Sequence, residues 1–248
     1  MKKNKKKMKK LNTSKLAIIL ILLLIIIIGL YTTLNSEILN SKNVEINGNN
    51  YVKNEDIIKD LDIKHDNNIF RYNIKSMEKI LLSNKYIDKV KIKRILPNTI
   101  NINIVEKEII AKLYNGQMYC YIDSNSNFID KFDEDNNDSS IITVHVDYTL
   151  IDSQYIKFKN EENRKRLLYL LEYIKEESIY KKINNINMTK ANVINMYTKD
   201  NTTILLDSDE DLKYNISRLA MILYDLQNKK QKGGEIDLSS GKYALYRP

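Results

Sequence analysis

The feature that most constrains this chain is an uncharged stretch at residues 16–34, which consists mostly of Leu and Ile. As a helix rising about 1.5 Å per residue, this stretch would span about 28 Å, close to the ~30 Å hydrocarbon core of a bilayer. No small-x-small cleavage motif follows it, as would be typical of a removable signal peptide. The sequence therefore predicts an uncleaved transmembrane helix.

The charges on either side of this stretch predict its orientation. Residues 1–15 contain eight lysines and no acidic residue. Positive flanks stay in the cytoplasm, so we expect a single-pass type II protein of the cell membrane with an outer C-terminal region. Without those eight lysines, the chain's 40 basic residues fall to 32, equal to its 32 acidic residues. The outer region is thus formally neutral, and we expect no nucleic-acid partner.

The outer region is long enough for two domains, and its single cysteine excludes an intrachain disulfide. In the first, at residues 38–108, short alternating stretches predict strands and a 3–4 spacing of apolar residues predicts helices. The expected order is strand, helix, helix, strand, strand, an α+β fold with two helices on one sheet. The predicted strands cover residues 44–46, 90–92 and 100–104, and the predicted helices cover residues 54–61 and 74–83, the second capped by Asn73.

The run RILPNTININIVEK at residues 94–107 lies behind a single anchor and resembles the POTRA domain of the FtsQ/DivIB family of bacterial cell-division proteins. Its motif residues are Arg94, Pro97, Asn98 and Glu106. Proline lacks an N–H for the ladder, so Pro97 should lie where a strand ends. A POTRA sheet keeps an edge open, and added strands are how such domains take partners. For any one of these residues, a purely structural role is equally compatible with the sequence.

The remainder, residues 109–248, is expected to form a second mixed β-sheet domain with helices, as in the same family. Asn115-Gly116 predicts a hairpin turn, and the polar composition of residues 130–140 predicts an exposed loop. The acidic residues of this loop could suggest a calcium site, but the stretch lacks the glycine and final glutamate of an EF-hand, which favours a solvated loop. Helices are predicted at residues 161–177, capped by Asn160, and from residue 208 to the Gly233-Gly234 pair. Strands are predicted at residues 183–188, 193–197 and 203–206, with a terminal strand pair within residues 235–246.

The Gly-x-Ile-Asp-Leu segment at residues 234–238 resembles the terminal motif of the FtsQ/DivIB family, although Ser239 stands where an arginine is usual. The resemblance implies that coiled-coil division proteins of the FtsB/DivIC and FtsL type dock here by adding a strand. It assigns partner binding to Ser240, Gly241, Tyr243 and Leu245. A lysine at position 242 offers the alternative that this edge is simply protected from pairing.

The resemblance implies a non-enzymatic scaffold protein that helps to regulate septal peptidoglycan synthesis. Two alternatives to this function remain. A sortase-like transpeptidase would need His65, Cys120 and an arginine such as Arg164, but Cys120 lies between tyrosines in an alternating stretch typical of a buried thiol. The second alternative is an envelope-assembly factor with a POTRA domain. Neither histidine has a second ligand at helical spacing, and no glycine-rich phosphate loop occurs. We therefore expect no catalytic residue, metal, cofactor or small-molecule substrate.

Overall fold

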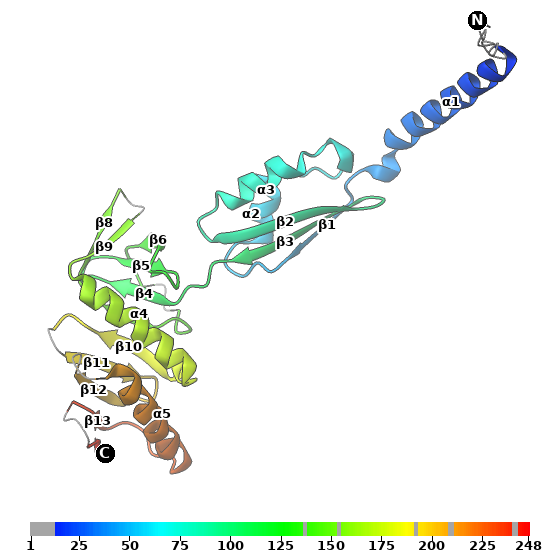
Figure 1. The fold of residues 1–248 in the computed structure, drawn as a ribbon. Coiled ribbons are helices and arrows are strands. Elements are labelled where there is room, and N and C mark those ends of the chain that lie inside the picture. Colours follow the sequence, from blue (N-terminus) through cyan, green and yellow to red (C-terminus); the bar gives the residue numbers. More distant parts are fainter. Residues whose placement is uncertain (1–12, 136–137, 153–154, 191–192, 208–210, 240–242) are drawn as a thin grey trace, which may run out of the picture. The chain divides into compact units, whose positions relative to one another are not determined.

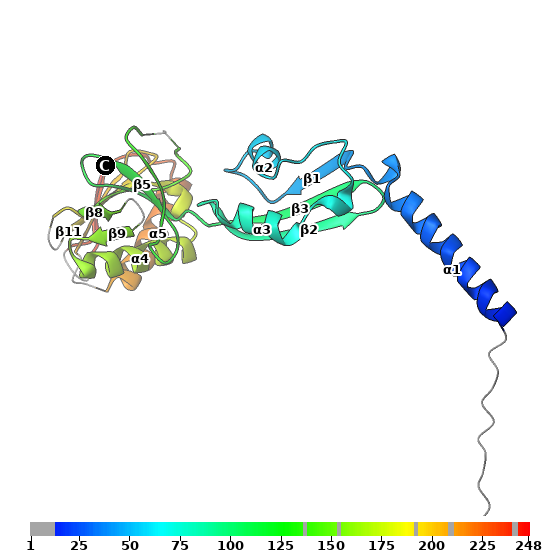
Figure 2. The same cartoon turned by 90° about the horizontal axis from the view of Figure 1, so that it is seen from above.

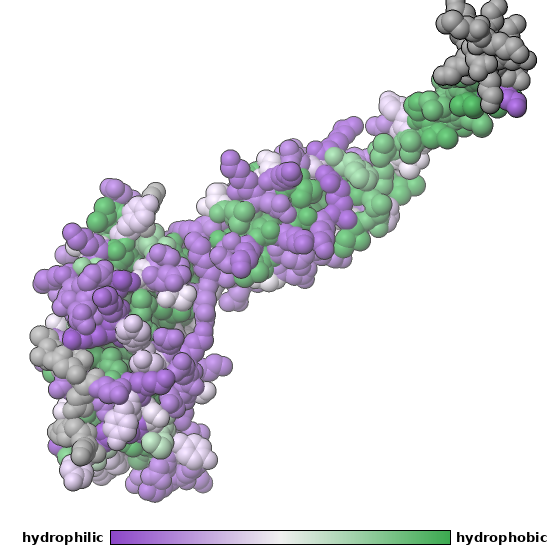
Figure 3. All heavy atoms as spheres, viewed as in Figure 1, coloured by the Kyte–Doolittle hydropathy of each residue, from purple (hydrophilic) through white to green (hydrophobic). Residues whose placement is uncertain are grey.

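The structure, a computed structural model, describes residues 13–135, 138–152, 155–190, 193–207, 211–239 and 243–248. Within this part of the chain, one helix is long and apolar enough to cross a membrane, namely Ser14–Leu34. It forms most of α1 (Thr13–Leu34), and Figure 3 shows hydrophobic side chains along its length. The chain divides into two compact units, residues 1–106 and 107–248.

The first unit continues from α1 into a three-stranded sheet with two helices on one face (Figures 1 and 2). The strand order is β1-β3-β2, with β3 parallel to β1 and antiparallel to β2. This is the expected α+β fold with the order β-α-α-β-β. Its elements are the 3-10 helix η1 (Glu37–Leu39), β1 (Asn43–Asn47), α2 (Asn54–Asp60), the 3-10 helix η2 (Ile69–Arg71), α3 (Ile74–Leu82), β2 (Ile87–Ile95) and β3 (Thr99–Glu106).

Local sequence explains why these elements form and how they pack. The Asn73 side chain caps α3 by accepting a hydrogen bond from the Ser76 amide at 3.2 Å, as predicted. Met77 and Leu81 on α3 are buried, and they belong to the same core as the inward side chains of β3. That core consists of Val52, Ile57, Leu61, Ile69, Met77, Leu81, Ile87, Ile92, Ile100, Ile102 and Ile104. Pro97 lies in the turn between β2 and β3, where the missing N–H costs no ladder bond.

The second unit is built on a nine-stranded mixed sheet with the order β14-β13-β12-β11-β10-β7-β4-β5-β6, beside a two-stranded sheet of β8 and β9. Its strands are β4 (Ala111–Tyr114), β5 (Tyr119–Ile122), β6 (Phe128–Phe132), β7 (Thr143–His145), β8 (Tyr148–Ile151), β9 (Tyr155–Phe158), β10 (Ile183–Asn187), β11 (Val193–Thr198), β12 (Thr203–Asp207), β13 (Glu235–Asp237) and β14 (Leu245–Arg247). Its helices are α4 (Glu161–Glu176), the 3-10 helix η3 (Tyr180–Lys182) and α5 (Leu212–Asn228).

Helices α4 and α5 cover one face of the nine-stranded sheet (Figure 1). The predicted cap of α4 is confirmed, since the Asn160 side chain accepts a hydrogen bond from the Glu162 amide. Helix α5 is capped by Asp211, whose side chain accepts from the Tyr214 amide, whereas its predicted start at residue 208 lies outside the described residues. Leu167, Leu170 and Leu171 of α4 are buried in the same core as Leu219 of α5. The apolar stripes read from the sequence therefore face the sheet.

Two local expectations are wrong. The stretch at residues 130–140 is not entirely loop, because β6 extends to Phe132 and pairs with β5. The last helix does not run to the glycine pair but ends at Asn228. Lys230 has a φ of 57°, and the Gln231 amide returns to the Leu226 carbonyl at 2.9 Å, so the turn that ends α5 is a Schellman motif with lysine at the position glycine usually holds.

Candidate partner-binding edges

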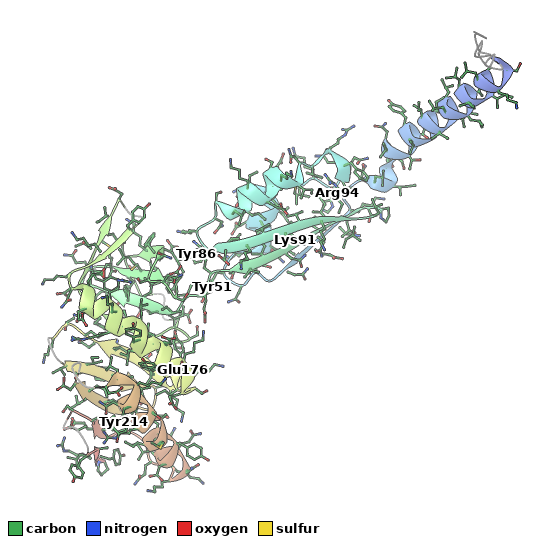
Figure 4. All side chains as sticks on the ribbon, in the orientation of Figure 1. Tyr51, Tyr86, Lys91, Arg94, Glu176 and Tyr214 are labelled. Atoms are coloured by element: carbon green, nitrogen blue, oxygen red, sulfur yellow. The ribbon has the colours of Figure 1, made fainter. Side chains whose placement is uncertain are left out.

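Arg94, the first of the motif residues, joins β2 to the segment ahead of α3. Its Nε donates a hydrogen bond to the Ile69 carbonyl at 2.7 Å, and its guanidinium also donates to the Tyr72 carbonyl. The same group lies 5.6 Å from the centroid of the Phe70 ring. Figure 4 labels Arg94 close to this segment. These contacts satisfy carbonyls that the 3-10 helix η2 leaves unpaired, so they favour a structural role for Arg94.

The other motif residues stabilise loops at the ends of the β2-β3 hairpin. The Glu106 carboxylate accepts hydrogen bonds from the Tyr51 amide at 2.9 Å and the Val52 amide at 2.8 Å. At the opposite end, the Asn98 carbonyl in the Pro97 turn accepts from the Lys42 amide at 3.0 Å. Arg94 pairs with Ile100 at that end, whereas Glu106 pairs with Ile87. The four residues therefore do not form one cluster.

The C-terminal strand β14 lies at one edge of the nine-stranded sheet, and of the strands that the structure describes it pairs with β13 alone. Of the four residues assigned to partner binding, Leu245 lies in β14 and is 50% exposed, and Tyr243 just before it is 81% exposed. Ser240 and Gly241 lie outside the described residues. The two described candidates thus lie together at a sheet edge with their side chains open to a partner.

Close backbone packing explains the Gly-x-Ile-Asp-Leu segment. A Cβ on Gly234 would lie 2.4 Å from the Arg247 carbonyl oxygen, and its φ is 79°, so only glycine fits beneath β14. Ile236 and Leu238 are fully buried. The Asp237 side chain accepts a hydrogen bond from the Ser239 amide at 3.0 Å, and its bonds to Ser239 hold the pKa of the carboxyl below its usual value.

A family model for the FtsQ-type POTRA domain matches residues 39–107. The cell division protein DivIB of Clostridium tetani is 30% identical over 203 residues, which cover 79% of this chain and 73% of the relative. The chain belongs to the FtsQ/DivIB family of cell-division proteins. DivIB of Clostridium acetobutylicum is 25% identical over 202 residues (81% of this chain, 79% of the relative), and FtsQ of Geotalea daltonii is 22% identical over 198 residues (79% and 70%).

As an FtsQ/DivIB family member with an apolar N-terminal helix, the chain is a membrane-anchored protein of the cell-division machinery. Of the residues considered for an enzymatic alternative, Cys120 and Arg164 have structural explanations, and His65 is an exposed residue of the first unit. Cys120 is fully buried, and burial raises the pKa of its thiol to about 12. His145 lies 2.9 Å from the Asn185 amide nitrogen, and Arg164 pairs with Glu161. Among the described residues, no group of three His, Cys, Asp or Glu could hold a metal.

One buried charge in this FtsQ/DivIB chain was not predicted from the sequence. Lys112 on β4 is 2% exposed, its ammonium pairs with Asp135, and it lies 5.6 Å from the centroid of the Tyr119 ring. Alternation along β4 indicates only that Lys112 points away from the helices. Nothing local shows that the segment after β6 returns over it, because that contact joins residues 23 positions apart.

Proposed function

We propose that this chain is a non-enzymatic scaffold of the divisome. It binds coiled-coil division proteins of the FtsB/DivIC and FtsL type outside the membrane and thereby helps to regulate septal peptidoglycan synthesis. The observation that carries the proposal is the terminal strand β14, which has one neighbour among the described strands and carries the exposed side chain of Leu245, with that of Tyr243 just before it. Family membership supports the setting, since the relatives are cell-division proteins.

The proposed mechanism is β-strand addition at β14. An edge strand presents N–H and C=O groups to a segment that pairs with it, and alternate side chains then set specificity. A partner strand beside β14 would place its own side chains next to Leu245, while Tyr243 contributes a large aromatic surface of the kind enriched at interface hot spots. In this proposal Ser240 and Gly241 belong to the same binding surface.

The proposed topology follows from the charges around α1. Residues 1–15 lie in the cytoplasm, residues 16–34 cross the membrane, and two outer domains at residues 38–108 and 109–248 meet partners at the division septum. The lysine-rich tail and the uncharged helix support this orientation. The buried, weakly acidic Cys120 supports a binding role over a sortase-like one, because the thiolate is the nucleophile in such enzymes.

The test is co-purification of the full chain with its FtsB/DivIC-type and FtsL-type partners from membranes. Deletion of residues 241–248 and Leu245→Lys should each abolish recovery of the partners, since both remove the docking strand or its apolar contact. The matched control is Tyr155→Ala, which alters a side chain that is 66% exposed on the separate β8-β9 sheet. Undiminished recovery with either edge variant would refute β14 as the docking strand.

A further variant separates the strand's position from its side chains. Gly234→Ala should displace β14, because the added methyl group meets the Arg247 carbonyl, and partner recovery should fall although Tyr243 and Leu245 are intact. Fluorescence imaging of a tag at Met1 then tests localisation in dividing cells. A mid-cell band before constriction is the expected result, and even labelling of the envelope would count against the scaffold.

A further inference from the structure

The second unit contains a pocket of about 560 Å³ where helix α5 ends beside the sheet. One wall is the last part of α5 with the residues that follow it, and the other comes from η3 and the turn that joins β11 to β12. Leu223 and Leu226 supply an apolar surface, and their side chains are only 7% and 6% exposed. A pocket of this size holds a small ligand or a few side chains of a peptide.

The charges around this pocket are mostly positive. Among the described residues, three lysines line it, Lys182 from η3 and Lys230 and Lys232 after α5, together with one carboxylate, that of Asp200. Lys232 lies 3.2 Å from Asp200, and both side chains are largely exposed. The Lys182 ammonium donates a hydrogen bond to the neutral Gln227 side chain at 2.7 Å, and within the described residues no ion pair involves Lys182 or Lys230. Three positive charges against one negative charge leave an excess of two.

Lys230 reaches this pocket from a strained backbone position. Its φ is 57°, in the left-handed region that glycine adopts without a steric penalty. The Lys230 amide donates to the Gln227 carbonyl at 3.1 Å, so the end of α5 fixes this conformation. Backbone strain of this kind clusters at functional sites, where the side chain at the strained position is needed. The side chain of Lys230 is therefore placed at the pocket at a cost in stability.

The hydrogen-bond donors of the pocket favour a carboxylate over a phosphate. The amides of residues 229–231 already donate to carbonyls of α5. The amides of Asn201 and Thr202, in the β11-β12 turn, donate to the carbonyl and the hydroxyl of Thr198. Phosphate sites are typically built from free backbone amides or arginine side chains, whereas this pocket offers lysine ammonium groups on flexible stems beside leucines. Such a surface suits carboxylates that are carried on either side of an apolar side chain.

We propose that this pocket binds a segment of a partner protein in which acidic residues flank one large apolar residue. The apolar side chain packs against Leu223 and Leu226, and the carboxylates pair with Lys182 and Lys230. Among the described residues, none from β14 lines the pocket. It is thus a second surface, and it rests on the proposed function only in that the chain has protein partners.

The experiment measures peptide binding to the full chain in lipid nanodiscs by fluorescence anisotropy. The probe is a labelled seven-residue peptide with the sequence Gly-Ser-Glu-Leu-Glu-Ser-Gly, and two matched probes replace its leucine by serine or both glutamates by lysine. The serine probe should bind at least about tenfold more weakly, because it buries no apolar side chain. The lysine probe should bind more weakly still, because the pocket repels it. Equal binding of the three probes would overturn the proposal.

Removal of charge tests the lysines. Lys230→Gly takes away one cation and suits the φ of 57°, so this variant should be at least as stable as the native chain yet bind the acidic probe about threefold more weakly. Lys182→Gln with Lys230→Gly should weaken binding about tenfold. The matched control, Lys181→Gln with Lys229→Ala, removes the same charge from neighbouring residues that do not line the pocket, and it should change the affinity by less than about twofold. Equal losses in the two double variants would refute the site.

Methyl NMR spectra of the chain in nanodiscs locate the bound probe. The methyl signals of Leu223 and Leu226 should shift when the leucine probe binds, and unchanged signals at saturation would refute the pocket. Inorganic pyrophosphate that displaces the probe at a concentration equal to or lower than that of unlabelled peptide would assign the pocket to phosphate groups and overturn the peptide segment. Leu245→Lys should leave probe binding unchanged, so a failure at β14 and a failure at this pocket are told apart.

Discussion

The pair of Lys112 and Asp135 gives the most quantitative prediction. The Lys112 side chain is 2% exposed, whereas that of Asp135 is 37% exposed. Removal of one partner of a fully buried ion pair costs about 3 to 5 kcal/mol, because the other charge remains without compensation. Water already reaches Asp135, so we expect roughly half of that loss, about 2 kcal/mol, for Asp135→Ala.

Lys112→Met should behave differently. The methionine side chain fills most of the space of the aliphatic part of Lys112, between the sheet and the segment that follows β6. It carries no charge, so no charge has to be desolvated. We expect a loss below about 1 kcal/mol, and the double variant Lys112→Met/Asp135→Ala should be no less stable than Lys112→Met alone. The double-mutant cycle then yields a coupling of about 2 kcal/mol.

The assay is urea unfolding of the full chain in nanodiscs, followed by hydrogen exchange of the peptides that cover β4 and β5. Exchange is needed because the chain has two units, so a single transition by circular dichroism would not report on this sheet alone. Additive losses in the double variant, or a greater loss for Lys112→Met than for Asp135→Ala, would refute the reasoning.

Three further predictions follow from local chemistry. Ser178 has a φ of 60° at the end of α4, so Ser178→Gly should stabilise the second unit by about 0.5 to 1 kcal/mol in the same urea assay, and unchanged stability would contradict the strain argument. Burial lowers the pKa of His145 below its usual 6.5, so the unfolded chain binds a proton more readily than the folded chain does. The free energy of unfolding should therefore fall as the pH drops below about 6.5, and His145→Gln should flatten that pH dependence. Because burial raises the pKa of Cys120 to about 12, its thiol should resist iodoacetamide at pH 8 until urea unfolds the sheet; rapid native alkylation would show an accessible thiolate.

Much of the fold can be predicted from local sequence, because its signals act over a few residues. Asn73 and Asn160 cap helices where a side-chain acceptor precedes a periodic apolar stretch. The alternation of Ile100 and Ile102 with asparagines indicates which face of β3 is buried, since side chains alternate along a strand. Such patterns determine the element type and the buried face together.

Contacts between residues that are far apart in the sequence could not be predicted in the same way. Strands β7, β8 and β9 were not predicted, because they are only three or four residues long and alternation over so few residues is a weak signal for a strand. The burial of Lys112 depends on a segment that returns 23 residues later, and the contact of Glu78 with Ile92 depends on how α3 lies on the sheet. The need for glycine at position 234 arises from β14, which passes over it from 13 residues further along the chain.

The short connection between α1 and β1 limits how the molecule searches for partners. Only eight residues separate Leu34 from Asn43, and even fully extended they reach about 28 Å. The start of the first sheet therefore stays in a thin layer above the lipid, and its encounters with other anchored proteins are effectively two-dimensional. Each lengthening of this connection would dilute the sheet over a larger volume, so its brevity itself keeps the local concentration of this domain at the membrane surface high.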